Sequence, residues 1–261
     1  IVGKKQVITS SWRKKVYSTG WRYGSGEAIA VVTPTNLPEI WKIINFCVKA
    51  DLIIIMQAAN TGLTGGSTPN GKNYDRPIVI INTLKVDQIH LIDSGKQIVG
   101  FAGSTLIGLE ESLMTFNREP HSVIGSSCIG ASIVGGVCNN SGGALIKRGP
   151  AYTELSLYAK IDNDGKLILI NELGIDLGNS PIEILENLQN KNYSNDDIKF
   201  PDKLCSDNEY MSRVRDIDAS SPARFNSDKR RLYGASGCAG KIAVFAVRLD
   251  TYPVPKRKKV F

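Results

Sequence analysis

A glycine-rich stretch, QAANTGLTGGSTP at residues 57–69, follows directly on the apolar run at residues 52–56. Such a short apolar run is typical of a buried strand, and a surface turn normally needs only one or two glycines. The stretch contains no Asp, Glu, Lys or Arg. Because glycines and small residues let successive backbone N–H groups converge on an anion, the stretch predicts a site for a phosphate-containing ligand at a strand end. The alternative is an ordinary surface turn.

The hydrophobic pattern predicts strands that alternate with helices. Three short apolar runs predict strands. At 35–51 the apolar residues recur at helical spacing, which predicts a helix between the first two strands and so a β-α-β unit. Further strands are expected on both sides of residues 94–96, in a hairpin at 152–173 and at 236–250, and helices at 104–117 and 181–189. The apolar runs are 28–32, 52–56 and 78–83. This order predicts an α/β or α+β fold and excludes a β-sandwich.

Composition narrows the class of protein. The chain has 261 residues, an apolar content of 42% and a net charge of +7, with no apolar stretch long enough for a membrane span and no secretory signal. Its five cysteines lack CxxC spacing and its two histidines are far apart, so neither a disulfide framework nor a zinc site is expected. The chain starts at Ile1 and stops at KRKKVF, and we expect a piece of a longer protein.

The positive charge could serve two kinds of partner. A nucleic-acid-binding module needs a continuous basic stripe with interleaved aromatic residues, whereas these cations lie in separate groups and aromatic residues make up 7%. That reading is disfavoured, and no nucleic acid is expected as a partner. Attraction to an anionic membrane surface stays open.

The standard nucleotide motifs are absent. A Walker A loop requires Gly-Lys followed by Ser or Thr, but Gly240-Lys241 is followed by Ile242. The GxGxxG fingerprint fails at residues 24–29, because position 29 is Ile. A P-loop enzyme and a nicotinamide-binding Rossmann domain are therefore disfavoured.

Three segments together carry a family resemblance. They are AANTGLTGGS at 58–67, PHSVIGSSCIGASIVGGVCNNSGG at 120–143 and SGCAGKIAVFAVRL at 236–249. Their order and spacing resemble flavoproteins of the vanillyl-alcohol oxidase type, with the PCMH-type FAD-binding fold. Within that group the chain resembles the membrane-associated, FAD-dependent D-lactate dehydrogenases of bacterial respiration, through NNSGG, RGPAYTE, LGIDLG and RVRDI.

The resemblance implies an α+β fold with two α/β subdomains that clasp FAD, at about 12–100 and 101–261, inside one FAD-binding domain at 1–261. It implies that the pyrophosphate lies against Ala58, Ala59, Asn60, Thr61, Gly62, Gly66 and Ser67. It places Gly125, Ser132 and Gly142 near the ribityl chain and flavin ring, and Val244 near the adenine. Residues 57–69 contain no His, the residue that anchors FAD covalently in many relatives, so the FAD is expected to be non-covalent; Cys128 and Cys138 are the alternative attachment points.

The implied activity is oxidation of D-lactate to pyruvate, with electrons passed through the flavin to a membrane quinone. The resemblance implies a peripheral protein at the cytoplasmic face of the bacterial inner membrane, whose substrate-covering and membrane-binding domain is absent from this chain. Another flavin-linked dehydrogenase of D-2-hydroxyacids, such as D-2-hydroxyglutarate or glycolate, is the alternative. No metal is expected.

A few polar residues near the second glycine-rich segment are candidates for chemistry. His121 is a candidate for proton transfer, or a structural histidine. Lys147 and Arg148 either place positive charge near the flavin or face solvent. Asn139 and Asn140 are expected to hold the loop backbone rather than to bind substrate.

Overall fold

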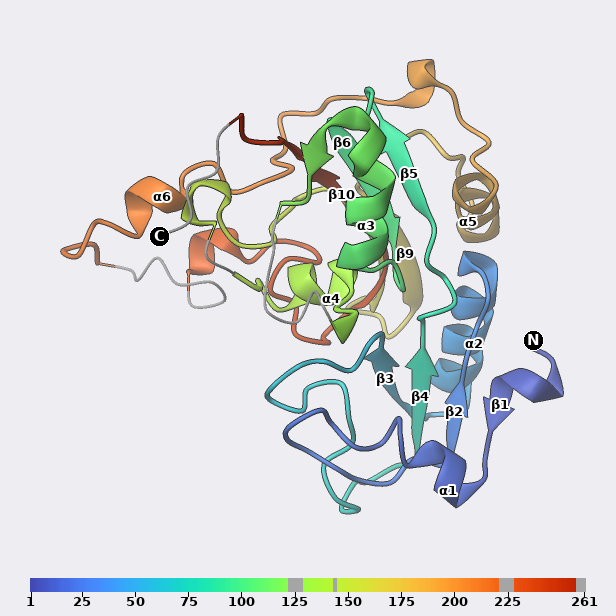
Figure 1. The fold of residues 1–261 in the computed structure, drawn as a ribbon. Helices are drawn as coiled ribbons and strands as arrows, with labels where there is room; N and C mark the ends of the chain where they lie inside the picture. Colours follow the sequence, from blue (N-terminus) through green and yellow to red (C-terminus); the bar gives the residue numbers. More distant parts are fainter. Residues whose placement is uncertain (122–128, 143–144, 221–227, 257–261) are drawn as a thin grey trace.

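The computed structural model describes residues 1–121, 129–142, 145–220 and 228–256. Two sheets lie one above the other in Figure 1, with helices packed along them. Within these ranges no helix is long and apolar enough to cross a membrane.

The first sheet has the strand order β1-β2-β4-β3. Its strands are β1 (Val7–Ile8), β2 (Ala30–Val32), β3 (Ile53–Gln57) and β4 (Ile78–Asn82). Strands β2, β4 and β3 are parallel, and β1 pairs with β2 in the antiparallel sense. The predicted β-α-β unit is confirmed, since α2 (Leu37–Lys49) connects β2 to β3.

Helix α2 begins where the sequence provides a cap. The Asn36 side chain accepts a hydrogen bond from the backbone N–H of Glu39, and Pro38 occupies the first turn, where a missing N–H costs nothing. Helix α5 (Pro181–Gln189) matches its predicted range and starts with a capping box between Ser180 and Glu183. The caps explain why both helix starts were predictable.

The second sheet is antiparallel, in the order β5-β6-β10-β8-β9. Its strands are β5 (Ile89–Ile92), β6 (Gln97–Phe101), β8 (Ser156–Ile161), β9 (Leu167–Asn171) and β10 (Ala243–Asp250). β7 (Arg118–Glu119) and β11 (Tyr252–Pro253) form a separate two-stranded ribbon. The chain passes from the first sheet to the second between Asn82 and Ile89.

Shorter helices complete the fold. α3 (Leu106–Leu113) has Thr105 as its N-cap and ends before the predicted position, because Met114–Phe116 forms a 3-10 turn. The others are α1 (Ser11–Lys14), α4 (Ile133–Cys138), α6 (Tyr210–Arg213) and the 3-10 helices at Lys4–Gln6, Ile146–Arg148, Asn195–Asp197 and Lys229–Arg231.

One apolar core joins the two sheets. It contains Ile81 of β4, Phe101 of β6 and Phe245 of β10, all fully buried, together with the inner faces of α2 and α5. The Trp41 and Phe245 rings lie 6.5 Å apart between centroids. Because this cluster spans both sheets, they are held in a fixed relation around the strand ends that carry the glycine-rich loop.

Candidate functional site

The glycine-rich loop begins at the carboxyl end of β3, where β2, β4 and β3 all end on the same side of their sheet. This is the edge at which sheets of parallel strands commonly bind ligands. In Figure 1 the arrowheads of β3 and β4 point toward the second sheet. The loop therefore starts at the junction between the two sheets.

Two buried amide side chains fix the start of the loop. The Gln57 side-chain amide donates to the backbone carbonyls of Tyr17 and Ser67, both at 2.7 Å. The Asn82 amide donates to the side-chain oxygen of Gln57 at 3.0 Å. Gln57 and Asn82 were not among the sequence candidates, although each is the polar residue that ends an apolar strand.

Hydrogen bonds within the loop set its width. Asn60 adopts a left-handed backbone conformation, with φ of 55°. Its amide donates to the carbonyl of Thr19 at 2.9 Å, and its side-chain oxygen accepts from the Ser67 hydroxyl at 2.7 Å. The buried Thr68 hydroxyl donates to the carbonyl of Gly65 at 2.9 Å. These side chains therefore shape the loop through hydrogen bonds to one another and to the backbone.

The glycines of the loop fall into two kinds. A Cβ on Gly65 would lie 2.8 Å from the Tyr23 carbonyl, and its φ of 73° also favours glycine. A Cβ on Gly62 or Gly66 would meet no atom within 4 Å, and neither has a positive φ. The fold therefore explains Gly65, whereas Gly62 and Gly66 keep open a space that no described part of the chain fills.

The loop backbone presents unpaired donors beside this space. Within the described ranges, the N–H groups of residues 60–67 donate to no protein acceptor, and the hydroxyls of Thr61 and Thr64 have no protein partner. The loop has no acidic residue to repel an anion. Bare N–H groups with glycines among them match the oxygens of a diphosphate.

Thr83 connects this loop to the second sheet. Its N–H donates to the Gln57 carbonyl at 2.8 Å, and its hydroxyl donates to the Ala102 carbonyl at 3.1 Å. A Cβ on Gly103 would lie 2.1 Å from the Thr83 carbonyl oxygen. The close approach of these backbones requires glycine at 103 and fixes the loop relative to the end of β6 (Gln97–Phe101).

Ser132 lies at the start of α4, close to the end of β6. Its side chain accepts from the N–H of Gly135 at 3.1 Å and caps the helix. The neighbouring Ile133 N–H donates to the carbonyl of Ser104 at 2.9 Å. The second glycine-rich segment is therefore linked through residues 102–104 to Thr83 and the first loop.

The other predicted cofactor residues lie in different places. Gly125, like Cys128, falls outside the described residues. Gly142 is half-buried after the end of α4. Val244 is buried in β10, and the pairing of β10 with β8 shifts register between Val244 and Ala246. Such an irregularity leaves backbone groups outside the regular ladder.

His121 is buried, with 3% of its surface exposed, and within the described chain its Nδ1 has no hydrogen-bond partner. Burial, and secondarily the positive charge of Arg148, lower the pKa of His121 to about 4. The imidazole is consequently neutral at physiological pH. A group with this pKa is a weak base at neutral pH.

The solvent-facing alternative for Lys147 and Arg148 is wrong for the arginine. Arg148 donates to the carbonyl of Pro120 and to the carboxylate of Glu119, both at 2.7 Å, and its side chain is 11% exposed. It therefore neither faces solvent nor offers a free charge, whereas Lys147 is exposed. Arg148 ties the 3-10 helix at Ile146–Arg148 to the segment before His121.

Asn139 and Asn140 differ in role. The Asn139 amide donates to the Gly135 carbonyl at 2.8 Å and holds the end of α4, as predicted. Asn140 is 1% exposed, and neither polar atom of its side chain has a hydrogen-bond partner in the described chain. A Cβ on Gly237 would lie 2.7 Å from the Asn140 amide nitrogen, so this side chain packs against the turn before β10.

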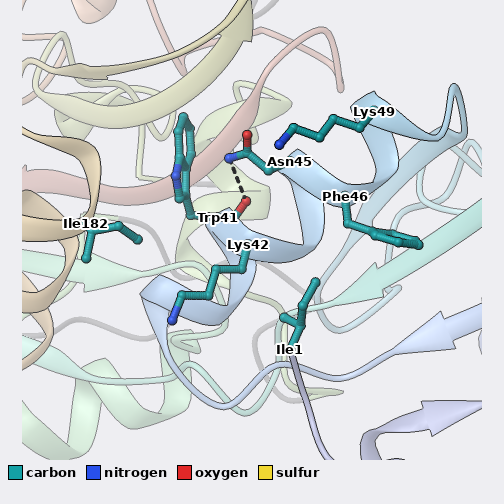
Figure 2. Close-up of a pocket in the computed structure, with 7 residues that line it drawn as sticks. All are labelled: Ile1, Trp41, Lys42, Asn45, Phe46, Lys49 and Ile182. Carbon is teal, nitrogen blue, oxygen red and sulfur yellow. Dashed lines mark hydrogen bonds between the residues drawn. The ribbon is translucent and has the colours of Figure 1, made fainter.

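Figure 2 shows the residues that line an open pocket beside α2, and none of them is a predicted site residue. Trp41, Asn45 and Phe46 project from the helix, and the Asn45 amide donates to the Trp41 carbonyl at 3.2 Å. The full lining is Ile1, Trp41, Lys42, Asn45, Phe46, Lys49 and Ile182.

Within the described ranges no group of three or more His, Cys, Asp or Glu could hold a metal ion.

The chain matches a known family and several curated relatives. The FAD binding domain family matches residues 28–170, more than half of the chain. The quinone-dependent D-lactate dehydrogenases of Haemophilus influenzae and Escherichia coli are 57% and 54% identical over all 261 residues. A mitochondrial D-2-hydroxyglutarate dehydrogenase of Arabidopsis thaliana is 29% identical over 66% of the chain and 31% of its own length. The chain spans 46% of the length of each of the two bacterial relatives.

Solved structures share the fold. An alkyldihydroxyacetonephosphate synthase superposes with a TM-score of 0.64 at 12% identity over 98% of this chain and 38% of its own. A p-cresol methylhydroxylase does so with a TM-score of 0.57 at 14% identity, over 98% and 42%. The predicted α+β fold of the PCMH type is confirmed.

Proposed function

This chain belongs to the FAD binding domain family, and from that membership we propose that it is the cofactor-binding half of a quinone-dependent D-lactate dehydrogenase. The observation that carries the proposal is the open face of Gly62 and Gly66 beside the unpaired N–H groups of residues 60–67. The identity of more than half to two such dehydrogenases over the whole chain supports it.

The residues of this chain would hold the cofactor rather than react. The loop from Ala58 to Ser67 would hold the FAD diphosphate through its N–H groups, with Asn60 and Ser67 fixing the loop's width. Gly125, Ser132 and Gly142 would lie along the ribityl chain and flavin, and Val244 near the adenine. Bound FAD would supply the electron acceptor for oxidation of D-lactate to pyruvate, with a membrane quinone receiving the electrons.

We propose that the FAD is bound without a covalent link. Residues 57–69 contain no His, and the Cys138 thiol is hydrogen-bonded to Cys238. Acid precipitation of the full-length protein should leave intact FAD in the supernatant. Flavin fluorescence that stays with the denatured polypeptide would contradict the non-covalent proposal but not the FAD site itself.

The substrate is proposed to be D-lactate, and the residues that bind its carboxylate are proposed to lie in the remainder of the full-length protein. The alternative is another D-2-hydroxyacid. Quinone-analogue reduction by the full-length enzyme, measured with D-lactate, L-lactate, D-2-hydroxyglutarate and glycolate, separates the two. The proposal expects the highest kcat/KM with D-lactate, whereas a higher value with D-2-hydroxyglutarate would favour the alternative.

We propose peripheral binding at the cytoplasmic face of the inner membrane, with anionic lipid as a partner. The exposed fractions of Trp12 and Trp21 are 79% and 60%, and Arg13, Lys15 and Arg22 beside them are also exposed. Exposed tryptophans next to cations are typical of residues at a membrane interface. Sedimentation of the full-length protein should be greater with vesicles that contain phosphatidylglycerol than with pure phosphatidylcholine. Equal sedimentation with both would contradict the role of anionic lipid.

A further inference from the structure

Two cysteines a hundred positions apart meet beside the second glycine-rich segment. Cys138 is the last residue of α4, and Cys238 lies in the tight turn before β10. The Gly237 N–H donates to the Val137 carbonyl and the Ala239 N–H donates to the Cys138 carbonyl, each at 3.0 Å. These two backbone bonds flank Cys238 and hold the turn in register against the helix end.

The two sulfur atoms are in direct contact through a hydrogen bond between the thiols. The N–H groups of Gly240 and Ile242 are also directed at the Cys238 sulfur. The hydrogen bond from Cys138, followed by those from the backbone, lowers the pKa of Cys238 to about 7. The same contact raises the pKa of Cys138 well above its usual range. One thiol is thus set to ionise and the other to remain protonated beside it.

The other described cysteines lack this environment. Burial raises the pKa of Cys47 to about 11 and that of Cys205 to about 12. Neither lies against another cysteine in the described chain, and the Cys205 sulfur accepts instead from the Gln97 amide at 3.1 Å. Cys238 is 9% exposed and Cys138 is partly exposed.

We propose that Cys138 and Cys238 form a redox-active dithiol, which a hydroperoxide converts into an intramolecular disulfide. The proposal does not depend on the D-lactate dehydrogenase activity. Its basis is the contact between the two sulfurs, the flanking backbone bonds and the backbone donors around Cys238.

The reaction proceeds in two steps. The Cys238 thiolate attacks an oxygen of the hydroperoxide, a sulfur–oxygen bond forms as the oxygen–oxygen bond breaks, and the released alkoxide or hydroxide takes up a proton. Cys138 then loses its proton and attacks the Cys238 sulfur, so that the disulfide forms and hydroxide leaves as water. The two thiols lose two electrons and the peroxide gains them.

The disulfide would join the end of α4 to the turn that leads into β10. Both segments belong to the apolar cluster that contains Val137, Cys238 and Val244. A covalent link between them restricts the unfolded chain over about a hundred residues and is expected to stabilise this half of the protein. The oxidised protein should therefore unfold at a higher temperature than the reduced protein.

The test uses the full-length, flavin-loaded protein with a Cys128→Ser change, because trypsin leaves Cys128 and Cys138 in one peptide. The reduced protein is treated with hydrogen peroxide, alkylated, digested without reductant and analysed by mass spectrometry. The proposal expects a peptide pair joined through Cys138 and Cys238 that dithiothreitol separates. It also expects that Cys138→Ser abolishes this pair and leaves a sulfenic acid on Cys238 that dimedone traps.

A Cys205→Ser variant serves as the control and should form the cross-link at the unchanged rate. Two results would overturn the proposal: Cys238 recovered fully alkylated after peroxide treatment, or oxidation of Cys238 no faster than that of Cys205. Alkylation of reduced Cys238 in native buffer shows whether the site is accessible and folded in each variant, so a misfolded variant is recognised.

Discussion

The Ser67 hydroxyl donates a 2.7 Å hydrogen bond to the side-chain oxygen of Asn60 and so joins the two ends of the glycine-rich loop. Between them lie Gly62 and Gly66, which face open space, and N–H groups that no described protein atom accepts. The loop is thus held in shape by its own side chains while its backbone remains free. This arrangement allows binding of a diphosphate without a prior rearrangement of the loop.

Gly66→Ala tests whether the open space beside Gly66 binds a ligand. The new methyl group meets no protein atom, so the free energy of unfolding of the FAD-free protein should change by less than about 0.5 kcal/mol. FAD should bind about tenfold more weakly, a loss of about 1.4 kcal/mol, because the methyl group enters the space proposed for the diphosphate. Fluorescence titration with FAD and urea unfolding measure the two quantities.

Gly65→Ala is the matched control for Gly66→Ala. Its Cβ would lie 2.8 Å from the Tyr23 carbonyl, at a φ of 73°, so it should lower the free energy of unfolding by about 1–3 kcal/mol. If Gly66→Ala left FAD affinity unchanged, the diphosphate would not lie against Gly66.

The Asn60–Ser67 hydrogen bond should contribute to FAD affinity as a coupled pair. Ser67→Ala removes the donor, and Asn60→Gly removes the acceptor but keeps the left-handed conformation at Asn60 accessible. Each single change should weaken FAD binding. The loss of binding free energy in the double variant should be larger than in either single variant but smaller than the sum of the two single losses. A coupling energy of about 1 kcal/mol, about fivefold in Kd, is expected from a double-mutant cycle. Strictly additive effects would show that the bond does not shape the bound loop.

Gly103→Ala should weaken the junction between the sheets. Its Cβ would lie 2.1 Å from the Thr83 carbonyl, and such overpacking typically costs about 1–3 kcal/mol. Gly136→Ala in α4, whose new Cβ would lie 3.6 Å from the Cβ of Ala151, should leave the stability unchanged or raise it by up to about 1 kcal/mol. Urea unfolding of both variants checks the difference, and equal stabilities would contradict the close backbone approach.

Acid should destabilise the protein through its two buried histidines. Burial lowers the pKa of both His121 and His90 to about 4, with smaller effects from Arg148 and Lys191. In the unfolded chain these histidines bind protons near pH 6.5, whereas in the folded protein they do so only near pH 4. The free energy of unfolding is therefore highest above pH 6.5 and decreases as the pH falls from 6.5 through 4, by about 3 kcal/mol for each histidine. His121→Asn and His90→Asn should each reduce this loss, as measured by urea unfolding at pH 7, 5.5 and 4. A pH profile unchanged in both variants would contradict the neutral state of the imidazoles.

The same His121→Asn variant decides the candidate role in proton transfer. A pKa near 4 makes His121 a weak base at neutral pH, so D-lactate turnover by the full-length enzyme should fall less than tenfold at pH 7.5. A loss of about 100-fold or more, at unchanged FAD content, would instead assign His121 a direct catalytic role.

The strand and helix pattern was predictable where local signals are strong. The capping residues Asn36 and Ser180 and the turn at 162–165 fix their elements through nearby atoms alone. The glycine-rich loop was recognisable because so many glycines without charges rarely follow a buried strand. By contrast, the predicted end of α3 at residue 117 lies beyond its actual end at Leu113. The apolar pattern continues into Met114–Phe116 and does not distinguish an α-helix from a 3-10 turn.

Contacts between distant segments could not be predicted from the sequence. Gln57 and Asn82 each end an apolar run, but only the parallel pairing of β3 with β4 brings their amides together. Likewise, Arg148 was expected near the flavin or in solvent, and its contact with Glu119 depends on tertiary packing over 29 positions. Composition and spacing carry no information about such pairings.

Hydrogen–deuterium exchange of the full-length protein with and without FAD shows whether the loop backbone holds the diphosphate. Backbone amides of residues 60–67, unpaired in the described chain, should exchange rapidly without FAD and become protected when it binds. Peptides covering the outer face of α2 around Phe46 should exchange at the same rate in both states. FAD bound at full occupancy with no added protection at residues 60–67 would show that this loop does not hold the diphosphate.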